Sequence, residues 1–178
     1  MNYFEVFGLP KILNIDLNTL ERKFHELSRK SHPDYFTTAG AEERQQALQM
    51  TATLNDAYRT LRHPVQRVEY LVNLEGFKPD GSKVPKAFLM EVFEINEQIE
   101  EVKAGKATRE QIGALTREIE ERAARFESQL RTASMEWDKL VESNASEAQL
   151  RQQLTKLTEI LSESSYIRNL QRELEEKP

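Results

Sequence analysis

The sequence predicts an all-α protein made of two helical units, and three observations lead to this prediction. Apolar residues recur three and four positions apart along most of the 178-residue chain, which is the period of an amphipathic helix. No segment shows the alternation of apolar and polar residues that is typical of a strand. The segment at 76–86, GFKPDGSKVPK, interrupts the helical pattern with two glycines, two prolines and a Pro-Asp-Gly turn, and we predict that it is a linker. The expected units are therefore 1–75 and 87–178.

Four helices are expected in the first unit. Asn2 can cap a short first helix, which Gly8 and Pro10 end. Longer helices are predicted at about 17–30 and 41–61, and Pro64 suits the first turn of a further short helix. The positions predicted to face the core are Tyr3, Phe4 and Phe7, then Leu17, Leu20, Phe24 and Leu27, then Ala47, Thr51, Leu54, Tyr58 and Leu61, and finally Val65, Val68, Leu71 and Val72.

Three longer helices are expected in the second unit, at about 86–104, 108–142 and 146–175. Ala-Gly-Lys at 104–106 and Ser-Asn-Ala-Ser at 143–146 separate them. Short connections make consecutive helices antiparallel neighbours, so we predict an antiparallel three-helix bundle. A coiled-coil oligomer is the competing interpretation, which the breaks in the pattern disfavour.

Composition narrows the classes of function. A formal net charge of -5 argues against nucleic-acid binding, and no apolar run reaches the roughly 18 residues of a membrane span. The start of the chain lacks the features of a secretory signal, so a cytoplasmic location is expected. The absence of cysteine excludes disulfides, a thiol nucleophile and Cys-based metal ligation, and no cofactor is expected.

The tripeptide His32-Pro33-Asp34 ends the second predicted helix. Pro33 disfavours a helical conformation of His32 and lacks an N–H, so the helix must stop just before them. One interpretation is that the tripeptide is only a stop signal. Another is catalysis, with His32 as a base oriented by Asp34, but no nucleophile accompanies it, and His25 and His63 are too scattered to form a metal site.

A third interpretation joins this corner to the helix before it. On a 3.6-residue period Arg22 and Arg29 share a face, and Lys23 and Lys30 form an adjacent row. Such a cluster is usually a solvated helix face. Combined with the His-Pro-Asp corner, it indicates a docking surface for an acidic partner.

A four-helix unit with a basic second helix, a His-Pro-Asp corner and a longer third helix resembles the J-domain, which stimulates ATP hydrolysis by DnaK-type chaperones. NYFEVFGLP at 2–10, LNDAYRTLRHPVQRVEYLV at 54–72 and AFLMEVFEINEQIEE at 87–101 make nearly the whole chain similar to the HscB-type J-proteins of iron-sulfur cluster biogenesis. The resemblance implies that an HscA-like or general DnaK-type chaperone is bound by His32, Pro33, Asp34, Arg22, Lys23, Arg29 and Lys30. Generalist J-domains often carry a basic pair where His25-Glu26 stands and a lysine where Tyr35 stands, which favours a dedicated chaperone.

The helix at 86–104 has a second apolar surface. At about 100° per residue, Phe88, Val92, Ile95, Ile99 and Val102 fall on one line, the predicted core face. The side and back of the same helix carry further apolar residues among acids, and these are either buried by neighbouring helices or form an exposed protein-binding surface. In HscB-type proteins this surface holds the cluster scaffold IscU. The resemblance therefore implies scaffold contacts at Leu89, Met90, Phe93, Glu94, Glu97 and Tyr166.

The predicted function is that of a non-enzymatic co-chaperone, which presents an IscU-like scaffold to a DnaK-type ATPase. One alternative is a J-domain adaptor that delivers a different client to a general chaperone. A more remote alternative is a helical structural protein, in which His-Pro-Asp only ends a helix. None of these functions involves nucleic acid or membrane.

Overall fold

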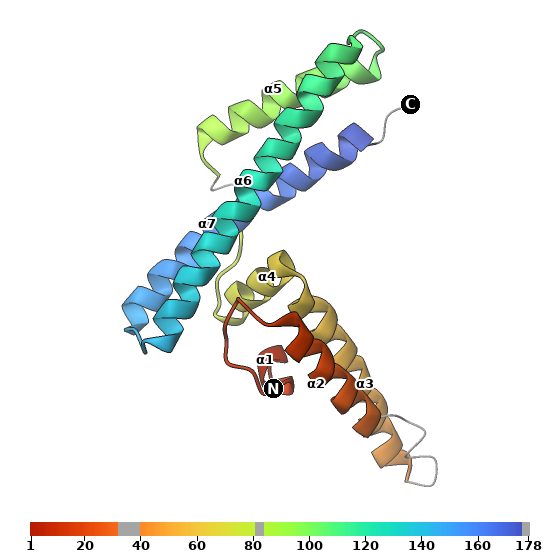
Figure 1. Cartoon of the computed structure of the whole chain (residues 1–178), viewed down its shortest axis with the longest axis vertical. Helices are drawn as coiled ribbons and strands as arrows, with labels where there is room; N and C mark the ends of the chain where they lie inside the picture. Colours follow the sequence, from red (N-terminus) through yellow and green to blue (C-terminus); the bar gives the residue numbers. More distant parts are fainter. Residues whose placement is uncertain (32–39, 81–83, 176–178) are drawn as a thin grey trace.

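The computed structural model describes residues 1–31, 40–80 and 84–175, and every element of secondary structure in these ranges is a helix (Figure 1). The helices begin and end within two residues of the predicted positions. Their bounds are α1 Tyr3–Val6, α2 Leu17–Lys30, α3 Ala41–Arg62, α4 Pro64–Leu74, α5 Lys86–Lys103, α6 Arg109–Glu142 and α7 Glu147–Glu175.

Side chains just before the helices fix several of these starts. Asn2 accepts a hydrogen bond from the Glu5 amide, and the Glu5 carboxylate accepts one from the Asn2 amide, which completes a capping box as the position of Asn2 predicts. Thr108 and Gln111 form the same arrangement at α6. Asp16 caps α2 by accepting hydrogen bonds from two amides of its first turn.

The first unit packs α1 and the antiparallel pair α2 and α3 around one core. Phe4, Leu20, Leu54 and Leu61 are buried, as their spacing predicts. Leu17, which was predicted to belong to the same stripe, is 51% exposed. It is the first residue of α2, so the helical period places it correctly in angle but says nothing about where the neighbouring helices end.

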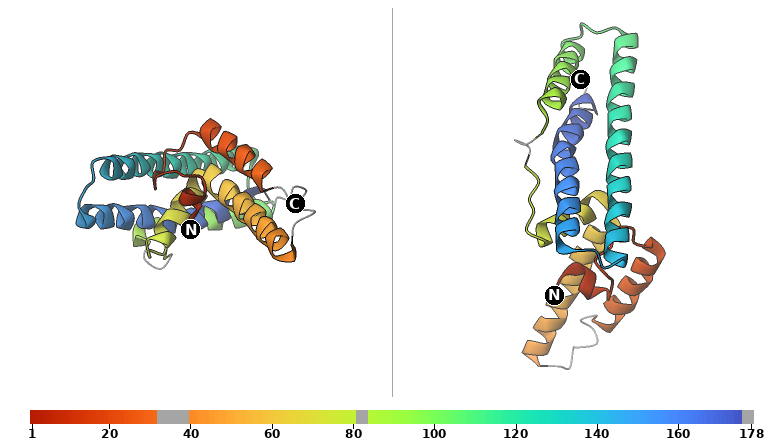
Figure 2. Two further views of the ribbon diagram at one scale, coloured as in Figure 1. Left: turned by 90° about the horizontal axis from the view of Figure 1, so that it is seen from below. Right: turned by 90° about the vertical axis from the view of Figure 1, so that its left-hand side faces the viewer.

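The second unit is the predicted antiparallel three-helix bundle. Helices α6 and α7 form a long hairpin, and α5 lies along the half of it that is farther from the first unit (Figure 2). The core of this half contains Phe88, Val92, Ile95 and Ile99 of α5, so the predicted core face is confirmed, although Val102 at its end is only half-buried. The two breaks in the pattern are tight connections, where Gly105 and Asn144 have positive φ angles of 67° and 52°.

The first unit packs against the other half of the hairpin, near the end of α6 (Figures 1 and 2). The carboxylate of Asp138, which is buried, accepts hydrogen bonds from the amides of Leu13 and Asn14 at 2.6 and 2.7 Å. The indole N–H of Trp137 donates to the Lys11 carbonyl at 2.8 Å. Two consecutive residues of α6 therefore hold the loop that leads into α2.

Arg67 of α4 also holds this loop. Its guanidinium is buried and donates to the carbonyls of Leu13 and Leu61. Burial lowers the pKa of Arg67, and the negative charge of Asp138 opposes this shift. The two buried charges are therefore near enough to compensate each other.

The segment predicted as a linker packs against α7. The Asp80 amide donates to the Ser162 hydroxyl at 3.0 Å, and the Arg151 guanidinium lies 5.5 Å from the centre of the Phe77 ring. Val84 is buried in the core. The described part of this segment thus packs along the surface of the bundle.

We predict that Asp138→Ala lowers the free energy of unfolding by about 3 kcal/mol, because it leaves the buried Arg67 without its countercharge and two loop amides without an acceptor. Urea unfolding measures this change. Glu120→Ala, at an exposed position of the same helix, is the control and should change the value by less than about 0.5 kcal/mol. Equal effects of the two variants would contradict a structural role for Asp138.

Candidate protein-binding surfaces

The basic face of α2 is exposed at Arg22, Arg29 and Lys30. Lys30 pairs with Glu26 at 2.9 Å, and its hydrogen bond lowers the pKa of that carboxyl. Both side chains of the pair are largely exposed, so water screens the attraction. The cations of this face therefore stay available to an acidic partner.

Lys23 differs from the other cations of α2. Its ammonium donates to the carbonyls of Phe7 and Gly8 at 2.7 and 3.3 Å, at the end of α1. A cation at this position stabilises the carbonyl end of a helix. Lys23 thus has intramolecular partners that the helical period alone could not reveal.

His32, Pro33 and Asp34 lie outside the described residues. The residue before them confirms the predicted end of the helix, since α2 ends at Lys30 and Ser31 is its C-cap. The Ser31 carbonyl accepts a hydrogen bond from the Thr51 hydroxyl of α3 at 3.1 Å. The end of α2 is therefore fastened to α3.

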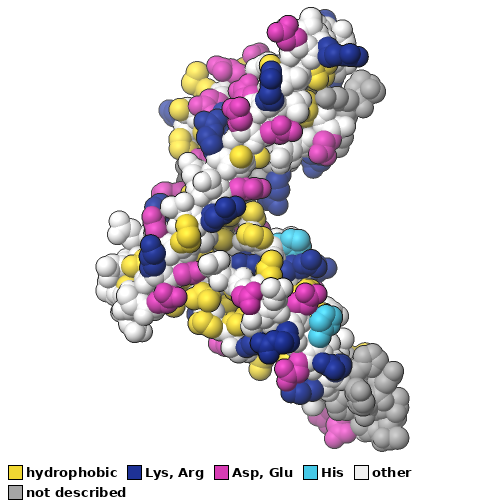
Figure 3. Space-filling view, viewed as in Figure 1, with side chains coloured by type: hydrophobic (Ala, Val, Ile, Leu, Met, Phe, Trp, Pro, Cys, Tyr) yellow, Lys and Arg dark blue, Asp and Glu magenta, His cyan; other side chains and the backbone are white. Residues whose placement is uncertain are grey.

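The second predicted surface lies on α5. Met90 and Phe93 are 65% and 62% exposed, and Glu94 and Glu97 are also exposed. Figure 3 shows hydrophobic side chains beside acidic ones over this helix. Leu89 is half-buried and packs against the core. Both interpretations of the pattern thus apply, exposure to Met90 and Phe93 and partial burial to Leu89.

Tyr166 of α7 lies against the inward face of the same helix. Its half-buried ring meets the buried Phe88 ring edge-on, with 5.9 Å between centres. Phe88 lies roughly 200° around α5 from Met90, because two residues separate them by about that angle. Tyr166 is therefore close to α5 but on a different side from Met90.

A buried arginine, missed by the sequence reasoning, holds this part of α5 to the bundle. Arg122 of α6 donates to the Glu91 carboxylate, and its guanidinium lies 5.4 Å from the centre of the Phe88 ring.

The charge of Arg122 also acts on Glu163 of α7, which is half-buried. Burial raises the pKa of Glu163, the charge of Arg122 opposes this rise, and the charge of Glu91 adds to it. Among the described residues, Arg122 Nε is the one buried side-chain nitrogen or oxygen that has no hydrogen-bond partner. The sequence contains one indication of this role: Arg122 lies three residues after Ile119 and so falls within the apolar stripe of α6.

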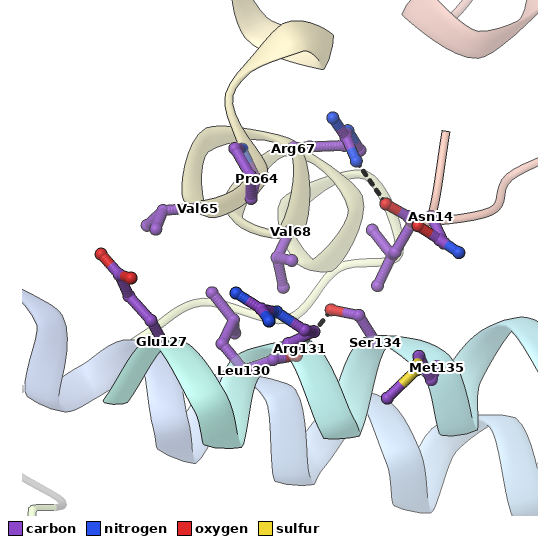
Figure 4. Close-up of a pocket in the computed structure, with 11 residues that line it drawn as sticks. Asn14, Pro64, Val65, Arg67, Val68, Glu127, Leu130, Arg131, Ser134 and Met135 are labelled. Carbon is purple, nitrogen blue, oxygen red and sulfur yellow. Dashed lines mark hydrogen bonds between the residues drawn. The ribbon is translucent and has the colours of Figure 1, made fainter. Parts of the chain in front are cut away.

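The structure also has a cavity of about 540 Å³ where the first unit meets α6 (Figure 4). Val65, Val68 and Leu130 line it, and Glu127 and Arg131 add charge. The Ser134 hydroxyl donates to the Leu130 carbonyl of its own helix at 2.7 Å. Among the described residues that line the cavity there is no histidine.

Among residues 1–31, 40–80 and 84–175, no three histidine or acidic side chains are grouped closely enough to bind a metal ion. None of the helices within those ranges has the length and apolarity needed to cross a membrane.

These observations define the class of the protein as a J-domain joined to an antiparallel three-helix bundle. The sequence profile of a family described as the HSCB C-terminal oligomerisation domain matches residues 84–175. The chain belongs to the HscB family.

Relatives and solved structures agree with this assignment. Co-chaperone protein HscB homologs from two strains of Vibrio cholerae serotype O1 are 42% identical over 107 residues, a stretch that covers 58% of this chain and only 63% of each relative. The structure of the chaperone HscB from Vibrio cholerae has a TM-score of 0.74 and 30% identity, with 98% of this chain and 96% of that chain covered. Human co-chaperone protein HscB, at 22% identity, has a TM-score of 0.73 over 98% of this chain and 81% of its own, and it supports the fold alone.

We predict that Lys23→Met lowers the free energy of unfolding by about 1 kcal/mol, because it removes two hydrogen bonds and a cation from the end of α1. Arg22→Met, at an exposed position one residue away, should change it by less than about 0.5 kcal/mol. Urea unfolding followed by circular dichroism compares the two. A smaller loss for Lys23→Met than for Arg22→Met would show that the contacts of Lys23 do not stabilise the fold.

Proposed function

We propose that this protein is a co-chaperone, which stimulates the ATPase of an HscA-like or DnaK-type chaperone and delivers an IscU-like iron-sulfur cluster scaffold to it. The observation that carries the proposal is that one chain of the HscB family exposes two separate surfaces of opposite character. Basic residues lie on α2 of the first unit, and apolar residues among acids lie on α5 of the bundle.

The chaperone-binding surface consists of the His-Pro-Asp corner and the basic face that precedes it. The exposed cations at Arg22, Arg29 and Lys30 favour an acidic partner surface and raise the rate of encounter with it. Lys23 contributes by fixing α1 to α2. His32, Pro33 and Asp34 act directly on the chaperone at the end of this face.

The scaffold-binding surface is centred on Met90 and Phe93. These side chains offer apolar area that a partner can bury, and Glu94 and Glu97 at the rim favour a basic partner surface. Leu89 and Tyr166 support the surface through their contacts with the core and with Phe88.

The mechanism is recruitment together with selection of a chaperone conformation. Binding of both partners to one chain turns delivery of the scaffold into an effectively intramolecular event. Preferential binding of the His-Pro-Asp corner to the hydrolysis-competent state of the chaperone raises the population of that state. This chain performs no step of the phosphoryl chemistry, which belongs to the chaperone.

We predict that His32→Gln abolishes stimulation of the chaperone's ATPase and leaves helicity and scaffold affinity unchanged. The expected loss is complete because the corner, and not the scaffold surface, acts on the chaperone. Single-turnover ATP hydrolysis by an HscA-like chaperone, with and without the scaffold, is the measurement. Wild-type stimulation by this variant would refute the docking role of the corner.

We predict that Phe93→Ala weakens scaffold binding by about tenfold or more, because it removes a large exposed apolar side chain from the centre of the surface. Leu48→Ala is the matched control, since Leu48 is 57% exposed but lies on α3. Calorimetric titration with the scaffold gives both affinities. Leu89→Ala adds a check on folding, because Leu89 packs partly in the core.

Recovery of a general chaperone client but no cluster scaffold, on immobilised wild-type protein, would favour the alternative adaptor over the iron-sulfur assignment. Equal affinities of Phe93→Ala and Leu48→Ala for the scaffold would place the binding surface elsewhere on the chain.

A further inference from the structure

The chain contains no cysteine and four methionines, so its thioethers are its readily oxidised sulfur groups. Susceptibility of methionine to peroxide follows the exposure of the sulfur. Met90 is 65% exposed, compared with 44% for Met135 and 40% for Met50. Apart from the terminal Met1, Met90 is therefore the methionine most open to an oxidant.

Met90 also has the position at which oxidation matters most. Phe93, which is 62% exposed, lies three residues further along α5 and thus on the same side of the helix. Met135 lines the cavity between the first unit and α6 (Figure 4), and Met50 lies on α3. Met90 is thus the methionine that belongs to the exposed apolar surface of α5.

We propose that Met90 is an oxidation site that controls scaffold docking, an inference that rests on the proposed function. Hydrogen peroxide transfers one oxygen atom to the Met90 sulfur, so that an S–O bond forms, the O–O bond breaks and water leaves. The thioether loses two electrons and the peroxide gains them. The product is methionine sulfoxide, which sulfoxide reductases convert back to the thioether.

The sulfoxide is incompatible with an apolar interface because its oxygen is a strong hydrogen-bond acceptor. A docking partner removes water from that oxygen, and an acceptor buried without a donor is costly. Three exposed polar residues flank Met90 on α5: Glu91, Glu94 and, one turn earlier, Lys86. Ionised carboxylates are acceptors only, so the Lys86 ammonium is the one possible donor among these three. Neither carboxylate can therefore compensate a buried sulfoxide oxygen.

Oxidation at this site changes binding without changing the fold. The core contacts of α5 are made by Phe88, Val92, Ile95 and Ile99 on another face of the helix, and Met90 is absent from the core cluster. An oxygen atom on Met90 therefore projects into solvent in the free protein. Oxidation of Met90 therefore leaves the core contacts of α5 intact.

The test uses the full chain and hydrogen peroxide, which is removed before the scaffold is added so that the scaffold is not oxidised. Peptide mass spectrometry follows sulfoxide formation at each methionine over time, circular dichroism follows folding, and calorimetric titration gives scaffold affinity. The variants are Met90→Leu, which keeps apolar area without sulfur, Met90→Gln, which adds a polar group without oxidant, and Met135→Leu as the matched control.

We expect Met90 to form sulfoxide before Met50 and Met135, and the treated wild-type chain to bind the scaffold about tenfold more weakly with unchanged helicity. Treated Met90→Leu should bind as untreated Met90→Leu does, treated Met135→Leu should lose affinity as the wild type does, and Met90→Gln should bind weakly without treatment. Treatment with a sulfoxide reductase should restore the wild-type affinity.

Unchanged affinity after complete oxidation of Met90 would overturn the inference, and so would an equal loss of affinity in treated Met90→Leu. Failure of untreated wild-type protein to bind the scaffold would instead contradict the proposed function. In that case slower oxidation of Met90 than of Met135 would separately overturn its assignment as the sensitive site.

Discussion

The buried carboxylate of Asp138 is the interaction on which the arrangement of the two helical units depends. A loop that runs between helices has amides with no partner in a helix, and burial of such amides is unfavourable unless they find an acceptor. Asp138 supplies that acceptor from α6, while Arg67 donates to the carbonyl of the same loop from α4. Because the two charges are opposite and both are buried, each reduces the cost of burying the other. Removal of either would leave the other as an uncompensated charge.

Helix α6 relates this anchor to the surface on α5. Sixteen residues separate Arg122 from Asp138, which corresponds to about 24 Å along a helix. Arg122 and Phe88 join α6 to α5 near one end of this distance, and Asp138 joins α6 to the loop before α2 at the other. The helices that carry the basic face and the apolar surface are therefore attached to α6 at two separate positions along its axis.

Much of this fold follows from local sequence patterns. The helical period places Phe88, Val92, Ile95 and Ile99 in the core, and the Gly and Pro residues at 76–86 identify the non-helical connection. The same period places Met90 and Phe93 off the core face of α5, whereas their exposure is a result of the structure. These features depend on residues that are close in sequence, and the helical period relates the positions of such residues.

Contacts between distant parts of the chain could not be predicted in this way. Asp138 meets a loop 125 residues earlier, and nothing near it in the sequence distinguishes it from the exposed acids of α6. Lys23 shares an angular position with solvated cations, yet the end of α1 lies within reach of its ammonium. Tyr166 could be assigned to the surroundings of α5 only by resemblance, because no period relates α7 to α5.

The distance in sequence between the loop and its anchor has a consequence for synthesis of the protein. The first four helices leave the ribosome well before Trp137 and Asp138, so the amides of Leu13 and Asn14 remain hydrated while the rest of the first unit folds. The orientation of α2 relative to the bundle therefore becomes fixed only after the end of α6 has emerged and α7, which packs against α4, has followed it. A chain interrupted before that point would lack the hydrogen bonds that hold the loop before α2, whereas in the finished chain a segment from its last third holds this loop.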